Sequence, residues 1–137
     1  MPPISLVAIA IAFIAELAAD CLIQMFLFVL FAGDQLRTGM SEEDYQSLVQ
    51  DICQTTALPY WLMAFGLATT VGGAYLAARI AKRIPYYHGL AIGIVGVLYV
   101  AIASDKFDGQ TWLGILLTIP LSLYGAHLAR RHLGPAE

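Results

Sequence analysis

Three polar side chains recur every four residues inside an apolar stretch near the N-terminus. The stretch runs from Ile4 to Phe31 and carries Glu16, Asp20 and Gln24. Four-residue spacing puts all three side chains on one face of a helix. An acidic group inside a lipid-crossing helix is costly, so it must face protein, water or a bound cation. This pattern predicts either hydrogen bonding between helices or the binding and release of a cation, usually a proton.

Hydroxyl groups in later apolar segments are expected at depths comparable with these acids. With Glu16 near the middle of the membrane, a rise of about 1.5 Å per residue puts Asp20 about 6 Å and Gln24 about 12 Å further out. The expected partners are Thr69, Thr70, Tyr99, Thr118 and Ser122. Every lysine and arginine lies at a predicted helix end or in a loop, so the acids lack a cationic partner within the bilayer. We therefore expect either neutral carboxyl groups that join helices or a wet path for protons.

The composition predicts a membrane protein of one domain, residues 1–137. Of its residues, 59% are hydrophobic and 12% are charged, and the mean hydropathy is +0.72. Soluble domains carry about 25% charged residues, so lipid is expected to solvate most of this surface. The net charge of −3 offers no basic patch for nucleic acid.

The hydrophobic pattern predicts an all-α fold with a bundle of four transmembrane helices. The apolar segments cover about residues 4–31, 57–80, 86–104 and 112–128. No basic residue precedes the first segment, so we interpret it as an uncleaved helix rather than a secretory signal. A short amphipathic helix is expected over residues 41–54 in the first outer loop, because Ser41 can cap it and apolar side chains follow at helical spacing.

The basic residues predict the orientation of this bundle. Five of them lie at the ends of the second and fourth apolar segments or just after them, namely Arg79, Lys82, Arg83, Arg130 and Arg131. The other two, Arg37 and Lys106, lie in the loops on the opposite side. The positive-inside rule then predicts that both termini are cytoplasmic and that the amphipathic helix is outside.

Small residues are expected to mediate the contacts between helices, because they let backbones approach closely in lipid. The predicted packing glycines are Gly66, Gly72, Gly73, Gly89, Gly93 and Gly96. In the last helix, Pro120 frees the carbonyl group of Leu116. We expect the hydroxyl groups of Thr118 and Ser122 to satisfy that carbonyl.

Two similar segments end the second and fourth apolar helices. GAYLAAR at Gly73–Arg79 and GAHLARR at Gly125–Arg131 agree at five of seven positions. Duplication of a helical hairpin and convergence between common helix-end residues both explain the match. GGAYLAARIAKR at Gly72–Arg83, the glycine-rich helix after it and the terminal GAHLARR resemble small bacterial four-helix membrane proteins of uncharacterised function. The resemblance covers about residues 57–132 and implies a bundle in the bacterial cytoplasmic (inner) membrane, without supplying an activity.

The remaining motifs do not indicate an enzyme. The glycines lie within apolar helices rather than in a phosphate-binding loop, and no cysteine–histidine cluster has metal-site spacing. Cys21 and Cys53 are expected to be free thiols, and His88, His127 and His132 to lie at the interface or in solvent. No catalytic residue, metal or cofactor is therefore predicted.

The favoured hypothesis is a non-enzymatic packing or accessory subunit in the lipid bilayer, associated with a second copy of itself or with a larger membrane protein. The alternative is a small proton-coupled transporter or channel that uses Glu16 and Asp20, because two acids one turn apart are well placed for a proton relay.

Overall fold

The described part of the chain is entirely helical apart from its connecting segments. The computed structural model describes residues 4–82, 84–104 and 108–133. Its helices are α1 (Leu6–Ala32), α2 (Glu42–Thr55), α3 (Leu58–Ala81), α4 (Pro85–Ala103) and α5 (Gly109–Leu133). Four of these, α1, α3, α4 and α5, are long and apolar enough to cross a membrane. The predicted all-α fold with four such helices is therefore confirmed.

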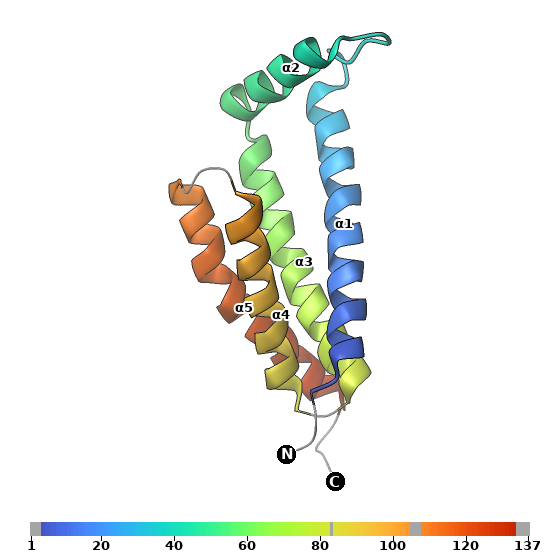
Figure 1. The fold of residues 1–137 in the computed structure, drawn as a ribbon, viewed down its shortest axis with the longest axis vertical. Coiled ribbons are helices and arrows are strands. Elements are labelled where there is room, and N and C mark those ends of the chain that lie inside the picture. Colours follow the sequence, from blue (N-terminus) through green and yellow to red (C-terminus); the bar gives the residue numbers. More distant parts are fainter. Residues whose placement is uncertain (1–3, 83, 105–107, 134–137) are drawn as a thin grey trace.

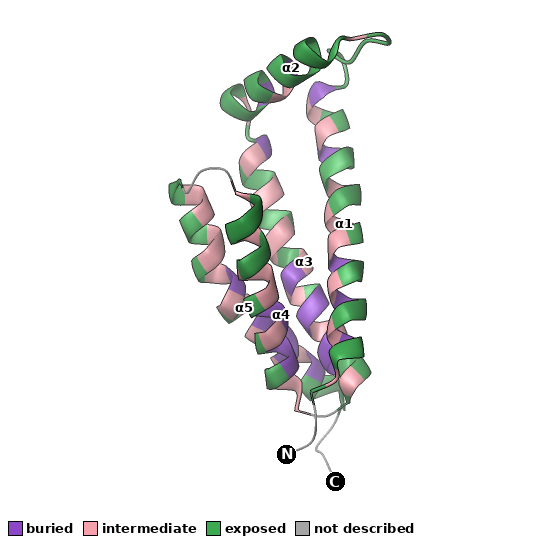
Figure 2. Ribbon diagram, viewed as in Figure 1, coloured by how far each residue is buried: buried purple, intermediate pink, exposed green. Residues whose placement is uncertain are grey.

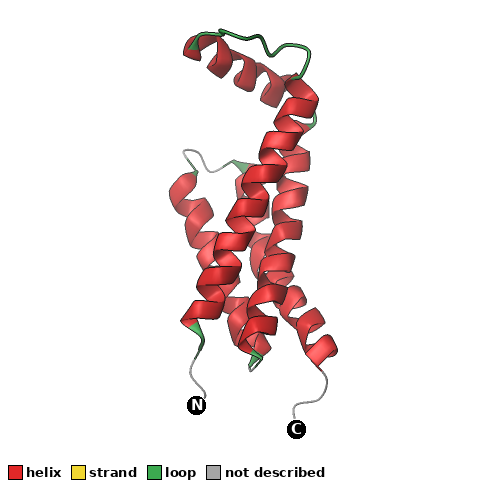
Figure 3. Cartoon of the chain, turned by 90° about the vertical axis from the view of Figure 1, so that its right-hand side faces the viewer, coloured by secondary structure: helices red, strands yellow, loops and turns green. Residues whose placement is uncertain are grey.

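The four long helices form a bundle with α3 at its centre. Helix α3 packs against α5, α1 and α4, whereas α1 contacts mainly α3. The start of α1 and the end of α5 lie at one end of the bundle, and α2 lies across the other end (Figure 1). The view from the side shows α2 crossing above the long helices (Figure 3).

The amphipathic helix α2 is capped by Ser41 and packs on the bundle through two apolar residues. The Ser41 hydroxyl accepts a hydrogen bond from the Asp44 backbone N–H at 3.1 Å, which satisfies one of the free donors at the helix start. Leu48 and Ile52 are buried against the end of α1 and the start of α3, and Ile52 is only 1% exposed. Helix α2 is therefore packed onto the two helices that it connects.

The half of the bundle near the chain termini is tightly packed by small residues. Buried residues gather in this half of the helices (Figure 2). A Cβ atom added to Gly89 of α4 would lie 2.6 Å from the Ala126 Cβ of α5. A Cβ atom on Gly125 would meet the backbone carbonyl oxygen of Val71 on α3. Small side chains thus allow α3, α4 and α5 to approach closely.

The predicted packing glycines divide into two groups. Gly73 lies against Glu16, Gly89 and Gly93 lie against α5, and Gly96 faces Thr118. Gly66 and Gly72 do not pack within this chain, because a Cβ atom on either would meet open space. Gly66 faces the space between the long helices and Gly72 is exposed on α3, so neither makes a close helix contact within the described residues.

The Leu116 carbonyl group, which lacks its usual helical donor because of Pro120, does not accept a hydrogen bond from Thr118 or Ser122. The prediction that these hydroxyls satisfy it is wrong. The Thr118 hydroxyl donates to the Gly114 carbonyl oxygen at 2.8 Å, and the Ser122 hydroxyl donates to that of Ile119 at 2.8 Å. In a helix these side chains reach carbonyl groups three or four residues earlier. The Leu116 carbonyl is two residues before Thr118 and six before Ser122, so neither hydroxyl bonds to it.

Candidate functional site

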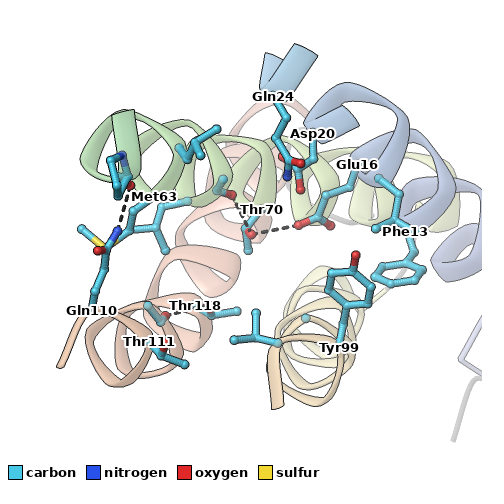
Figure 4. A pocket seen from close by; sticks show the side chains of 18 of the residues that line it. Phe13, Glu16, Asp20, Gln24, Met63, Thr70, Tyr99, Gln110, Thr111 and Thr118 are labelled. Atoms are coloured by element: carbon cyan, nitrogen blue, oxygen red, sulfur yellow. Dashed lines mark hydrogen bonds between the residues drawn. The ribbon is translucent and has the colours of Figure 1, made fainter. Parts of the chain in front are cut away.

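A cavity of about 390 Å³ lies between α1, α3, α4 and α5. In α3, α4 and α5 its walls come mainly from the part of the helix nearer α2, and in α1 they come from the middle of the helix. The polar lining residues are Glu16, Asp20, Gln24, Thr70, Tyr99, Asp108, Gln110, Thr111 and Thr118. Figure 4 shows the side chains of α1 and α3 facing those of α4 and α5 across this space.

Two acid–hydroxyl pairs join α1 to α3 beside the cavity. The Thr70 hydroxyl donates to Oε1 of Glu16 at 2.8 Å, and the Thr69 hydroxyl donates to Oδ1 of Asp20 at 2.5 Å. Both hydroxyls also lie within hydrogen-bond distance of the Gly66 carbonyl oxygen, at 3.1 Å for Thr70 and 2.8 Å for Thr69. The predicted pairing of the α1 acids with threonines of the second apolar segment is thus present.

The second oxygen of the Glu16 carboxyl group is buried without a partner. Glu16 is 8% exposed, and its Oε2 atom has no hydrogen-bond partner among the described residues. The carboxyl group fits beside Gly73, where an added Cβ atom would lie 2.5 Å from Oε2. A buried carboxyl oxygen without a partner is costly. It therefore marks Glu16 as a place where a proton or another cation would be stabilised.

The structure collects most of the predicted polar residues around this cavity, but not all of them. Tyr99 lines it and meets the Phe13 ring edge to face, with 6.2 Å between the ring centroids. Thr118 lines the cavity, although the Thr118 hydroxyl donates to a carbonyl group of α5 itself. Gln24 also lines the cavity and is an exposed residue. Ser122 lies outside the lining, fully buried against Gly93. Ser122 therefore belongs to the packed half of the bundle.

Sequence reasoning missed the contribution of the start of α5. Asp108 Oδ1 accepts hydrogen bonds from the Thr111 backbone N–H at 2.8 Å and the Thr111 hydroxyl at 2.9 Å. These bonds, the backbone one foremost, lower the pKa of Asp108, so this carboxyl group is charged near neutral pH. The Gln110 side-chain amide donates to the Pro59 carbonyl oxygen at 2.8 Å. The Asp108–Thr111 spacing could have indicated a helix cap, but not its position beside the cavity.

His88 is buried in the protein, so it is not one of the solvent-exposed histidines that the sequence allowed. It is 1% exposed, and its Nε2 atom accepts a hydrogen bond from the Ser5 backbone N–H at 3.0 Å. Its Nδ1 atom lies 3.2 Å from the Ile84 carbonyl oxygen, so the proton of the neutral ring is on Nδ1. The ring therefore connects the start of α1 to α4. It lies away from the cavity lining.

The donor set does not favour a multidentate metal site. Within the described ranges, no group of three or more histidine, cysteine, aspartate or glutamate side chains is arranged to hold a metal ion. Cys21 and Cys53 are exposed free thiols. No protein-family model, curated protein or solved structure matches this chain. Its function is therefore inferred from the cavity.

Proposed function

We propose that this chain is a small proton-coupled transporter or channel in the bacterial cytoplasmic membrane. The observation that carries this proposal is the buried Glu16 carboxyl group, which lines a cavity with one oxygen bonded to Thr70 and the other unpartnered. An ionisable group inside a transmembrane bundle is usually functional.

The neighbours of Glu16 suit both of its protonation states. When Glu16 is charged, its carboxylate accepts a hydrogen bond from the Thr70 hydroxyl, as described above. A neutral carboxyl group can instead donate to the Thr70 oxygen, and the hydroxyl then donates to the Gly66 carbonyl oxygen, 3.1 Å away. Only the threonine hydroxyl rotates, so binding or release of a proton needs little movement of the helices.

Asp20 repeats this arrangement one turn along α1. Its partner Thr69 shares the Gly66 carbonyl oxygen with Thr70. The shared carbonyl oxygen has no proton to pass on, but Glu16 and Asp20 both line the cavity one helical turn apart. A proton on Asp20 would therefore pass toward Glu16 through water in the cavity. Asp20 is less buried than Glu16, so a proton from outside the bundle would reach Asp20 before Glu16.

Proton flux into liposomes containing the purified protein tests this proposal. A membrane potential drives the flux, and a pH-sensitive dye inside the vesicles reports it. We expect Glu16→Gln to reduce flux to that of protein-free liposomes, while the matched control Asp51→Asn, on the exposed face of α2, retains it. Wild-type flux in a correctly folded Glu16→Gln variant would refute the proposal.

We also propose that both termini are cytoplasmic and that α2 is outside. The start of α1 and the end of α5 share one end of the bundle (Figure 1), and Arg79, Arg130 and Arg131 belong to the helix ends there. Arg83 and Lys106, which also entered the prediction, lie outside the described residues.

The exposed thiol of Cys53 on α2 makes this orientation testable. A membrane-impermeant thiol reagent should label it in intact cells, and Cys53→Ser should remove that label. Labelling only after the membrane is permeabilised would reverse the orientation.

A packing or accessory role is the second candidate function. It is favoured by Gly72, which is exposed on α3 and would leave room for an approaching helix. A cysteine at position 72 should form a cross-link with a second copy or a membrane partner in native membranes. A cysteine at Leu98, exposed on α4, provides the control and should form fewer cross-links.

A further inference from the structure

We infer that the cavity binds a protonated amine, that is, a small organic molecule with an N–H-bearing ammonium group and an apolar body. The inference rests on the proposed function, because the ammonium group would take the place of the proton at the α1 acids. It goes further in naming the chemical class of the ligand.

The charge of the lining selects a cation. Glu16 and Asp20 of α1 and Asp108 before α5 contribute three carboxyl groups, and none of the described lining residues is lysine, arginine or histidine. A cleft lined with one sign of charge and low-dielectric walls concentrates ions of the opposite sign. Anionic ligands are therefore disfavoured, and a neutral ligand would leave the Glu16 carboxyl group without a counterion.

The hydrogen-bonding groups select an ammonium ion with N–H donors. Such a group has up to three donors, and the carboxyl groups of Glu16 and Asp20, one helical turn apart, both belong to residues that line the cavity. Side chains four residues apart on a helix are close neighbours, so one ammonium group can reach both.

Neither a divalent metal ion nor a quaternary ammonium ion suits these groups as well. Calcium takes six to eight oxygen ligands, whereas no three acidic, histidine or cysteine side chains in the described ranges are arranged so that they could hold one metal ion. A quaternary ammonium ion has no donors and is recognised by the faces of aromatic rings. Phe13 and Tyr99 instead meet edge to face, so they do not form an aromatic cage.

The rest of the cavity suits a compact apolar body. Phe13, Leu17, Leu62, Met63 and Val100 line it beside the polar groups. Its volume of about 390 Å³ lies within the range of small-molecule sites, about 300–1,000 Å³. The tightly packed half closes the bundle beyond Glu16, so the ligand would enter from the side of α2 and Asp108.

Three matched probes test this inference: phenethylammonium, its N-trimethyl derivative and the neutral alcohol 2-phenylethanol. Binding is measured by calorimetry on the full chain in lipid nanodiscs at neutral pH. We expect phenethylammonium to bind at least tenfold more tightly than either analogue. Asp20→Asn should weaken its binding at least tenfold, and Asp51→Asn on α2 should leave it unchanged.

A second measurement uses only the wild-type protein. If the ammonium group replaces a proton at Glu16 or Asp20, adding phenethylammonium in weakly buffered solution should release protons, and adding 2-phenylethanol should not. Equal binding of the trimethyl derivative, or amine binding without proton release, would overturn the inference.

The two proposals fail in different ways. Proton flux that depends on Glu16, together with no binding of phenethylammonium, would overturn the amine inference and leave the proposed function intact. Amine binding that depends on Asp20, together with no proton flux in wild-type liposomes, would overturn the proposed function and support an amine-binding protein without proton coupling.

Discussion

The crossing of α3 and α5 at Gly125 yields the sharpest prediction about the fold. A Cβ atom at position 125 would meet the Val71 backbone carbonyl oxygen and lie 3.1 Å from the Ala74 Cβ atom. Neither group is the end of a flexible side chain, so the clash can be relieved only if the two helices move apart. We therefore expect Gly125→Ala to destabilise the bundle.

The size of this effect follows from a matched control on the same helix. Inserting atoms into a packed core costs about 1–3 kcal/mol, whereas replacing glycine by alanine in a helix gains about 1 kcal/mol of intrinsic propensity. Gly114→Ala has the same propensity gain without the clash, because a Cβ atom there meets open space. The free energies of unfolding of the two variants should therefore differ by about 1–3 kcal/mol, with Gly125→Ala the less stable.

Unfolding in mixed micelles, driven by an increasing fraction of a denaturing detergent and followed by circular dichroism, measures this difference. The wild-type protein is the common reference. Equal free energies of unfolding for the two variants would refute the close approach of α3 and α5 at this position. A less stable Gly114→Ala would refute the division into a packed half and a cavity half.

Three further predictions concern the acid–hydroxyl pairs, α2 and the start of α5. Thr70→Val removes the hydroxyl that bonds to Glu16 and should lower the free energy of unfolding by about 0.6 kcal/mol, the mean for hydrogen bonds between membrane helices; a gain in stability would contradict the pairing. Ile52→Ala should cost about 2–5 kcal/mol of local stability, seen as faster amide hydrogen exchange throughout α2, while unchanged exchange would show that α2 is not held by this side chain. The pKa of Asp108 is lowered in the folded chain, so its stabilising contribution is complete above the unfolded pKa of about 3.9 and is lost as the pH falls through the folded value. Asp108→Ala should accordingly lower the unfolding midpoint at pH 7 and have little effect in strong acid; an equal loss at both pH values would contradict this role of the carboxylate.

The helices could be predicted from the sequence because each signal for them is local. Hydropathy over about twenty residues defines a possible membrane span, and Ser41 followed by apolar residues at helical spacing defines α2. The last helix differs most, since it was expected over residues 112–128 and extends over Gly109–Leu133. Hydropathy marks only the apolar part of this helix. Its last turn holds Arg130, Arg131 and His132, which favour a helix C-terminus.

The contacts between helices could not be predicted to the same degree. A glycine permits a close approach but does not indicate which neighbour makes it, so Gly72 and Gly73 are adjacent in sequence yet only Gly73 packs against another helix. Thr118 and Ser122 are four residues apart on α5, but one lines the cavity and the other lies in the packed half. These outcomes depend on how the helices cross, and a single sequence does not specify that.

The position of Glu16 follows from the change in side-chain size along the bundle. One turn nearer the termini, Ala12 is fully buried among other small residues, and a carboxyl group there would be surrounded by apolar atoms. One turn nearer α2, Asp20 is more exposed and has no glycine beside it comparable to Gly73. Glu16 lies at the boundary, where Gly73 makes room for its carboxyl group and the cavity gives access to it. A carboxyl group moved one turn in either direction would lose its access or its enclosure, and the proton site that we propose requires both.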